Sequence, residues 1–272
     1  RDFCLSRGLG DVYKRQGIFS PEIADDGPTL ELAQFGMVSL FKIDPNNEFK
    51  RGGLADISFD RKNKTATVKI SKRAKWSDGH PVVARDLSFA YEIVANKAVG
   101  SSHYSEELEN IEGMREYHNG TADKISGLEE KDDKTLVIHF KKMKPTMTTT
   151  GSGYILESAE PYHYLKNVAM KDLVASDKLR KKPLFYGPFK IKKLVQGESI
   201  EWVPNKYYGG PKPKLAKIIT EIVPLSQAAT AMKSGKYDVL LNTSSATYNK
   251  IKDDKKLVTL GSLGTGITYL GF

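Results

Sequence analysis

The stretch that decides the fold is Lys75–Tyr91, which reads KWSDGHPVVARDLSFAY. Trp76 closes an alternating strand, and Ser77-Asp78-Gly79 is a turn signal because glycine accepts positive φ. From about residue 84 to residue 96, apolar side chains recur at helical spacing. A strand end, a tight turn and a helix are therefore predicted in consecutive residues. None of these residues forms a recognisable catalytic motif.

The composition is that of a globular protein. Of the 272 residues, 39% are hydrophobic and 28% are charged. No run approaches the ~18 apolar residues that a membrane span needs. The formal net charge is +9, but the basic residues are spread along the chain and interleaved with acidic ones. This pattern predicts a solvated basic surface rather than a nucleic-acid-binding face.

The two ends of the chain differ from the rest. Residues 1–16, RDFCLSRGLGDVYKRQ, have no apolar period and no signal-peptide core, and they resemble a non-native scar that stands outside the fold. They hold Cys4, the only cysteine, so the remainder predicts neither a disulfide nor a thiolate metal site. The chain stops inside an apolar, strand-like pattern at 267–272. We therefore expect a fragment of a longer protein.

The chain contains two kinds of predicted secondary-structure pattern, one after the other. Up to about residue 160 the sequence is rich in hairpins, with strands predicted at 55–59, 65–70 and 134–140. Beyond Pro161, strands are predicted at 189–194, 199–204, 216–223, 236–241, 257–260 and 265–272, with helices at 225–234 and 246–252. Such alternation implies parallel strands joined by crossover helices. The sequence predicts an α+β unit followed by an α/β unit.

Four segments in this order resemble the extracytoplasmic solute-binding proteins of peptide importers of the ABC type. They are Lys69–Tyr91 with its SDG-x-P, Gly187-Pro188-Phe189, Asn205–Gly210, and Ala228–Val239 with its Gly-Lys-Tyr-Asp. Each motif is weak alone, but their common order is specific. Two departures from the family pattern, Arg73 and Tyr208, are interpreted as surface or packing drift.

The resemblance implies an α/β fold of the periplasmic-binding-protein type II, in which two lobes trap a ligand between them. Residues 17–45 and 161–272 would form the first lobe, and residues 46–160 an inserted peripheral α+β domain. Trp76 and Tyr91 would pack the core of that inserted domain, away from the ligand. The second lobe would be missing, so we expect no useful ligand affinity from the 272 residues alone.

The resemblance also implies a function: capture of extended oligopeptides and their delivery to a membrane permease, without a cofactor. Capture without sequence preference uses main-chain hydrogen bonds and roomy pockets. The implied ligand-binding segments are Ile18-Phe19-Ser20 and Thr265-Gly266-Ile267, where glycine permits close backbone approach. Tyr154 is a weaker candidate. The alternatives are a surface loop at 18–20, a bulge at Gly266 and a packing role for Tyr154.

The location implied by the resemblance is extracytoplasmic, at the cell surface or in the periplasm. Members of this kind resemble lipoproteins, whose anchor would lie upstream of Gly17. Contact with the membrane is expected only through that anchor.

Other chemistries find little support in the sequence. No two of the five histidines share helical i,i+4 spacing and no HExxH occurs, so no metal site is predicted. No GxSxG or P-loop is present, and no catalytic residue is predicted. A hydrolase and a binding protein for a dipeptide, a sugar, nickel or another small solute stay open as alternatives. Neighbouring acidic residues are interpreted as solvated turns rather than a catalytic pair: Asp25-Asp26, Glu129-Glu130, Asp132-Asp133 and Asp253-Asp254.

Overall fold

A computed structural model describes residues 2–7, 17–241 and 243–260 of the chain, with residues 2–7 described as backbone alone. Its strands form a five-stranded sheet, a four-stranded sheet and a two-stranded ribbon. In chain order the elements are β1 (Asp2–Arg7), α1 (Gly27–Ala33), β2 (Lys42–Ile43), β3 (Phe49–Lys50), β4 (Ala55–Asp60), β5 (Thr65–Ile70), α2 (Ala84–Ala95), η1 (Leu108–Asn110), α3 (Met114–His118), β6 (Leu128–Asp132), β7 (Thr135–His139), η2 (Pro145–Thr148), α4 (Tyr162–Leu165), η3 (Met170–Ala175), α5 (Asp177–Arg180), β8 (Phe189–Val195), β9 (Ser199–Pro204), β10 (Lys217–Ile222), α6 (Leu225–Lys233), β11 (Val239–Leu240) and α7 (Ser245–Ile251).

The four-stranded sheet has the order β4-β5-β7-β6 and is antiparallel throughout. Its pairing follows the alternation of the sequence, because every second residue of a strand faces the same side. Ala66 lies opposite Ile138, and Val68 lies opposite Leu136. All four are buried, and α2 packs against β6 and β7. The hairpins predicted from alternation at 55–70 and around residue 134 are confirmed.

The five-stranded sheet has the order β11-β1-β10-β9-β8. β8, β9 and β10 are antiparallel, whereas β1 runs parallel to both β10 and β11. The parallel arrangement predicted from strand–helix alternation is therefore right for β10 and β11, which α6 connects. No crossover helix was predicted between β8, β9 and β10, and loops join these antiparallel strands.

The structure departs from the sequence analysis at both ends. Residues 2–7 of the segment set aside as a scar form β1, paired over their whole length with β10. This strand fills the position between β10 and β11, whose facing backbone groups need partners. At the other end, 257–260 is not a strand, and Val258 and Leu260 are 89% and 93% exposed. The strand predicted at 265–272 lies outside the described residues.

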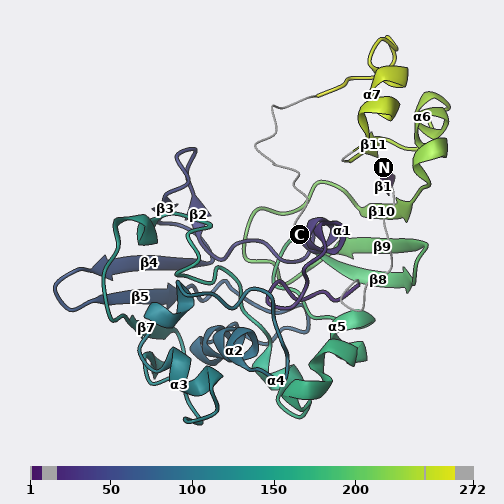
Figure 1. The fold of residues 1–272 in the computed structure, drawn as a ribbon. Helices are drawn as coiled ribbons and strands as arrows, with labels where there is room; N and C mark the ends of the chain where they lie inside the picture. The colour runs from purple at the N-terminus through teal and green to yellow at the C-terminus, as the bar shows by residue number, and fades with distance from the viewer. Residues whose placement is uncertain (1, 8–16, 242, 261–272) are drawn as a thin grey trace, which may run out of the picture.

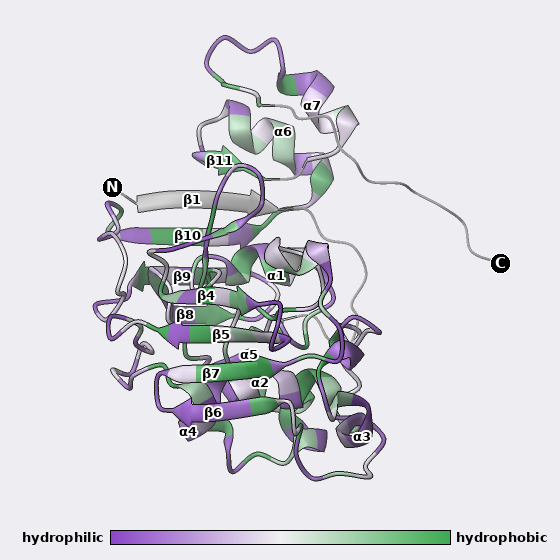
Figure 2. Cartoon of the chain, turned by 90° about the vertical axis from the view of Figure 1, so that its left-hand side faces the viewer, coloured by the Kyte–Doolittle hydropathy of each residue, from purple (hydrophilic) through white to green (hydrophobic). Residues whose placement is uncertain are grey.

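One main hydrophobic core extends under both sheets. It contains Val68 and Ile138 of the four-stranded sheet together with Ile200, Trp202 and Ile218 of the five-stranded sheet. Figure 1 shows the four-stranded sheet with α2 and α3 on one side of the molecule and β8, β9 and β10 on the other. In Figure 2 the strands of both sheets run across the view, from β11 at one end to β6 at the other. The two sheets therefore belong to one packed body.

Two smaller apolar clusters accompany the main core. One joins Ile18 and Ile23 to residues of α2 and of the segment from α4 to α5. The other consists of Val223, Met232 and Tyr237, beneath α6. Figure 1 shows α6 and α7 at the far end of the five-stranded sheet, away from α2 and α4.

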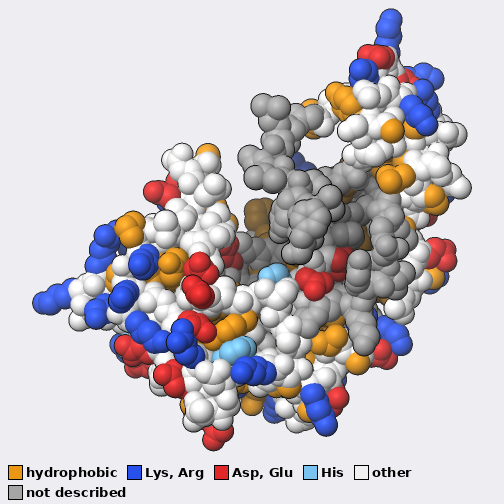
Figure 3. All heavy atoms as spheres, viewed as in Figure 1, with side chains coloured by type: hydrophobic (Ala, Val, Ile, Leu, Met, Phe, Trp, Pro, Cys, Tyr) orange, Lys and Arg blue, Asp and Glu red, His pale blue; other side chains and the backbone are white. Residues whose placement is uncertain are grey.

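The surface carries both signs of charge. In the face drawn in Figure 3, Lys and Arg side chains alternate with Asp and Glu side chains over most of the area drawn in colour. No helix within the described ranges has the length and apolar character required to cross a bilayer.

Candidate functional site

The first predicted ligand-binding segment is part of the core. Ile18, Phe19 and Ser20 are 0%, 3% and 0% exposed. The ring of Phe19 lies edge-on to those of Phe185 and Trp202, with centroids 6.0 and 6.1 Å apart. These three residues are buried as a whole, and the Phe19 N–H already donates to the Leu179 carbonyl at 2.8 Å, so the segment is fixed within the core.

The other predicted ligand residues have different surroundings. Tyr154 is half-buried and packs against the main core, in line with the alternative reading of a packing tyrosine. Thr265, Gly266 and Ile267 lie outside the described residues.

The stretch that decides the fold is a junction between the two sheets. Trp76 is fully buried, and its ring lies 5.3 Å from that of Tyr186. Its Nε1 donates to Asp86 Oδ2 at 2.8 Å, and the Val83 N–H donates to the same oxygen at 3.0 Å, which caps the first turn of α2. The Tyr162 N–H donates to Asp86 Oδ1 at 2.9 Å. Burial raises the pKa of Asp86, and these three hydrogen bonds oppose that rise.

Residues from three of the four family-like motifs meet at this junction. Three further hydrogen bonds tie them: Arg73 Nη1 to the Gly209 carbonyl at 2.6 Å, the Phe185 N–H to Ser77 Oγ at 3.1 Å, and Asn205 Nδ2 to the Gly187 carbonyl at 3.0 Å. Hereafter the motif junction denotes Arg73, Trp76, Ser77, Gly79, Asp86, Tyr162, Phe185, Tyr186, Gly187, Asn205, Tyr207 and Gly209.

Two glycines of the motif junction are required by close backbone contact. A Cβ at Gly187 would lie 2.3 Å from the Gly36 carbonyl oxygen, and one at Gly209 would lie 2.2 Å from the Arg73 carbonyl oxygen. A backbone oxygen cannot move aside as a flexible side chain can. These motif residues therefore act in packing between chain segments.

Arg73 is more than surface drift. Besides Gly209, its guanidinium donates to the Gly53 carbonyl through Nη2 at 3.1 Å. It thus joins the segment before β4 to the loop between β9 and β10. The two carbonyl acceptors are far apart in sequence, so a local pattern could not predict that Arg73 bonds to both.

The fourth motif lies apart from the junction, on α6 and the turn after it. Ala228, Ala229 and Met232 are buried beneath α6, as its helical spacing predicted. Gly235 follows the helix with φ of +73°, which suits a residue without a Cβ. This motif specifies a helix end and a small local core.

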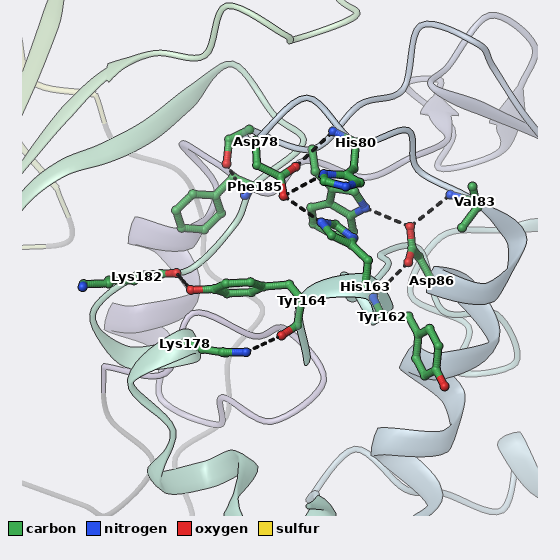
Figure 4. Close-up of polar contacts among 12 residues, drawn as sticks. Asp78, His80, Val83, Asp86, Tyr162, His163, Tyr164, Lys178, Lys182 and Phe185 are labelled. Carbon is green, nitrogen blue, oxygen red and sulfur yellow. Dashed lines mark hydrogen bonds and ion pairs between the residues drawn. The ribbon is translucent and has the colours of Figure 1, made fainter. Parts of the chain in front are cut away.

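A cluster of Asp78, His80 and His163 lies on the outer side of the motif junction (Figure 4). Asp78 Oδ2 is 2.7 Å from His163 Nε2 and 3.1 Å from His80 Nδ1. The two imidazole rings are stacked, with centroids 4.1 Å apart. Burial alone would raise the pKa of Asp78, but the hydrogen bonds from His163 and from the His80 N–H outweigh it and lower the pKa. Local spacing could not reveal this cluster, because Asp78 and His163 are 85 positions apart.

A buried pair of acids, Glu22 and Glu160, is a second feature that the sequence did not predict. Their exposed fractions are 2% and 1%. Ser158 Oγ donates to Glu22 Oε1, and the Glu160 N–H donates to the Asp86 carbonyl at 3.1 Å. Burial and then the neighbouring Glu22 raise the pKa of Glu160 well above its usual range. The pair thus lies beside the motif junction and is closed to solvent, unlike the carboxylates of a hydrolase cleft.

The acidic neighbours singled out in the sequence lie at the surface. Glu129, Glu130, Asp132, Asp133 and Asp253 are exposed, although the two glutamates belong to β6 rather than to a turn. Asp25 is also exposed, while Asp26 and Asp254 are half-buried. Asp26 Oδ1 accepts the Thr29 N–H at the start of α1. None of these acidic residues is among those that line the groove between β10 and α6.

An open groove of about 640 Å³ lies between β10 and α6. Its lining includes Glu198, Glu221, Gln227 and Lys236. Of the predicted ligand residues that the structure describes, Ile18, Phe19, Ser20 and Tyr154, none lines this groove. It therefore gives no support to those residues as a site.

Comparisons of this sequence with a family profile and with single proteins point to the same family. The profile of the bacterial extracellular solute-binding proteins, family 5 (middle part), matches residues 51–272. The oligopeptide-binding protein OppA of Lactococcus lactis subsp. lactis is 45% identical over 238 residues, which are 86% of this chain and 40% of that protein. A putative ABC transporter peptide-binding protein of Brucella ovis is 28% identical over 269 residues, covering 94% of this chain and 45% of the relative.

Solved structures show the same fold. Lactococcal OppA complexed with an endogenous peptide in the closed conformation superposes with a TM-score of 0.90 at 40% identity, over 93% of this chain and 48% of that one. AppA of Bacillus subtilis in complex with a nonapeptide gives a TM-score of 0.71 at 22% identity and shows likeness of fold alone. The chain thus spans less than half the length of these relatives.

Proposed function

Because the chain belongs to the bacterial extracellular solute-binding proteins of family 5, we propose that it forms one wall of a cleft that captures extended oligopeptides. The protein that carries it would be the substrate-binding subunit of an ABC importer and would deliver peptides to a membrane permease. The observation that carries this proposal is the likeness to the lactococcal peptide complex, at 40% identity and a TM-score of 0.90. The relatives are named as binding proteins rather than enzymes, and we propose no catalytic activity.

The ligand contacts that we propose are mainly with the main chain. The side chains of Ile18, Phe19 and Ser20 are buried, so they hold the backbone of this loop in one conformation. The Phe19 N–H donates to the Leu179 carbonyl and the Ser20 carbonyl accepts the Ala24 N–H, so the groups proposed to bond an extended peptide, as in strand addition, are the remaining main-chain groups of this loop. Thr265-Gly266-Ile267 would supply a second segment of this kind, and Tyr154 a side contact.

The domain division is also part of the proposal. Residues 17–45 and 161–272 would form the first lobe, and residues 46–160 the inserted peripheral domain. The separate four-stranded sheet of residues 55–139 supports that division. The shared core beneath both sheets indicates that they present the cleft wall as one rigid unit.

The family is described as extracellular, so a location outside the cytoplasm follows from membership. We propose that the protein is held at the membrane surface by a lipid anchor outside these residues. That proposal is tested by metabolic labelling of the intact protein with a fatty acid. Absence of label from the mature protein would exclude the anchor.

Isothermal titration tests the peptide proposal. A polypeptide of full family length that contains this chain would be titrated with mixed-sequence peptides of four to eight residues. We expect binding to peptides of unrelated sequence, because main-chain contacts dominate the recognition. Dipeptides, sugars and Ni²⁺ salts are titrated in parallel. Binding to one of these, with no heat from any of the longer peptides, would overturn the proposal.

A further inference from the structure

The cluster of Asp78, His80 and His163 has the composition of a transition-metal site. Two imidazole nitrogens and one carboxylate converge, and the three ligand atoms lie within 4.8 Å of one another. Imidazole suits Zn²⁺, Cu²⁺ and Ni²⁺, and two histidines with one carboxylate form a common open site for such ions. Figure 4 shows the carboxylate of Asp78 facing both rings.

The distances between the ligand atoms suit a single ion. Bonds of about 2.0–2.2 Å from a metal to imidazole nitrogen and carboxylate oxygen place neighbouring ligand atoms about 3 Å apart. The observed separations from Asp78 Oδ2 are 2.7 Å to His163 Nε2 and 3.1 Å to His80 Nδ1. A metal ion would take the place of the proton shared between His163 Nε2 and this oxygen. The two ring planes are stacked at 22°, so the imidazoles must turn out of the stack to point both nitrogen lone pairs at one ion.

The backbone that carries the cluster is held in place. The Trp76 N–H donates to the His80 carbonyl, and the Gly79 N–H donates to the Trp76 carbonyl, each at 2.8 Å. This closes the turn that carries Asp78 and His80. On the other side, the Tyr162 N–H bonded to Asp86 fixes the start of the segment that carries His163. Ligands on two anchored segments lose little freedom when they bind an ion.

The cluster is also accessible to an ion. The side chains of Asp78, His80 and His163 are 30%, 59% and 28% exposed, so an ion can enter and keep water in its open positions. Two lysines appear in the same view, and both interact with Tyr164: Lys178 Nζ donates to the Tyr164 carbonyl, and the Tyr164 hydroxyl donates to the Lys182 carbonyl.

We infer that Asp78, His80 and His163 bind one divalent transition-metal ion, such as Zn²⁺, which ties the turn of the motif junction to α4. The site is separate from the proposed peptide contacts and does not depend on them. Because the ion would bind the folded chain, it would raise the stability by mass action.

The inference is tested with ZnCl₂ on the full chain carrying Cys4→Ser, which removes the only thiol as a competing ligand. Titration calorimetry is expected to show one Zn²⁺ per chain, and the melting temperature is expected to rise with added Zn²⁺. Co²⁺ in place of Zn²⁺ reports the ligand set through its visible absorption spectrum.

Two variants and one matched control show whether the Zn²⁺ binds at this cluster. His80→Ala and His163→Ala should each weaken Zn²⁺ binding by at least about 10–100-fold, the cost found even for outer-shell partners of metal ligands. His139→Ala is the control, since His139 Nε2 lies 2.8 Å from Glu129 but belongs to no three-ligand cluster within residues 2–7, 17–241 and 243–260. His80 is the most exposed ligand, so its variant should fold normally. Equal Zn²⁺ affinity in the background, His80→Ala and His163→Ala proteins, or no measurable binding in any of them, would overturn the inference.

Discussion

The motif junction and the end of the sheet that carries α6 and α7 differ in how they are held. The junction joins distant segments through buried aromatic rings, backbone hydrogen bonds and glycines in contact with carbonyl oxygens. The α6–α7 end rests on the small cluster of Val223, Met232 and Tyr237 and leaves Leu225 and Tyr248 exposed. Three family-like motifs fall in the first region and one in the second.

This difference shows what the motifs specify. At the junction they fix how non-neighbouring segments pack, which is why a ligand need not touch them. On α6 the motif fixes a local helix end. Both kinds of motif identify a family through its architecture. The proposed ligand contacts, in contrast, are main-chain groups, which leave little signature in the sequence.

The largest expected effect is that of Trp76→Ala. Trp76 is fully buried, so its removal should lower the free energy of unfolding by roughly 3–5 kcal/mol. Met232→Ala, under α6, should cost about 2 kcal/mol or less, because its cluster is small and can collapse. Urea unfolding of both variants measures the difference. Equal losses of unfolding free energy in the two variants would show that the two regions are held equally strongly.

Glycine replacements give the next contrast. Gly187→Ala should cost roughly 3 kcal/mol, because its Cβ would meet the Gly36 carbonyl oxygen. In Gly235→Ala, at the end of α6, the added Cβ would meet no neighbouring atom. Only the positive φ would lower the free energy of unfolding, by about 1 kcal/mol. Thermal unfolding of the two variants is the measurement. A Gly187→Ala protein as stable as Gly235→Ala would show that the contact can relax.

Arg73→Ala should have a smaller effect. Its guanidinium loses two hydrogen bonds to backbone carbonyls, and its position is exposed, so the expected cost is about 1 kcal/mol. Lys193→Ala, an exposed basic residue with no such bonds to carbonyls among those described, serves as the control and should be near neutral. If both changes were neutral, Arg73 would be surface drift after all.

Glu160→Gln tests the buried acids beside the junction through a change with pH. The pKa of Glu160 is raised in the folded chain, so folding favours its protonated form. Between the usual glutamate pKa and the raised one, the folded state binds more protons than the unfolded state, and stability falls as pH rises. The variant should match the parent near pH 4 and be the more stable at pH 8. Melting curves at both pH values, with the exposed Glu129→Gln as control, check this, and a constant difference would contradict it.

Much of the fold follows from the sequence because its signals are local. Alternation predicted β4, β5 and β7, and helical spacing predicted α2 and α6. These signals come from residues that are neighbours in the chain. The difference between a hairpin and a strand–helix unit could be predicted in the same way, because their apolar residues are spaced differently.

The remaining features depend on contacts between distant residues. Nothing local in Asp2–Arg7 shows that these residues fill the place between β10 and β11. The pairing of Glu22 with Glu160 and of Asp78 with His163 arises only when the segment around α4 packs on the loop after residue 17 and on the turn before α2. The predicted strand at 257–260 is wrong because the apolar alternation there has no partner strand among the described residues.

Hydrogen exchange followed by mass spectrometry measures the central contrast directly. Amides in residues 73–91 should exchange only when the whole chain unfolds, since that segment is tied to both sheets. Amides in residues 225–251 should exchange through local opening, with a clearly lower free energy. That order of protection is the result expected if the family-like motifs hold the architecture together. Equal protection in the two segments, or faster exchange in residues 73–91, would contradict it.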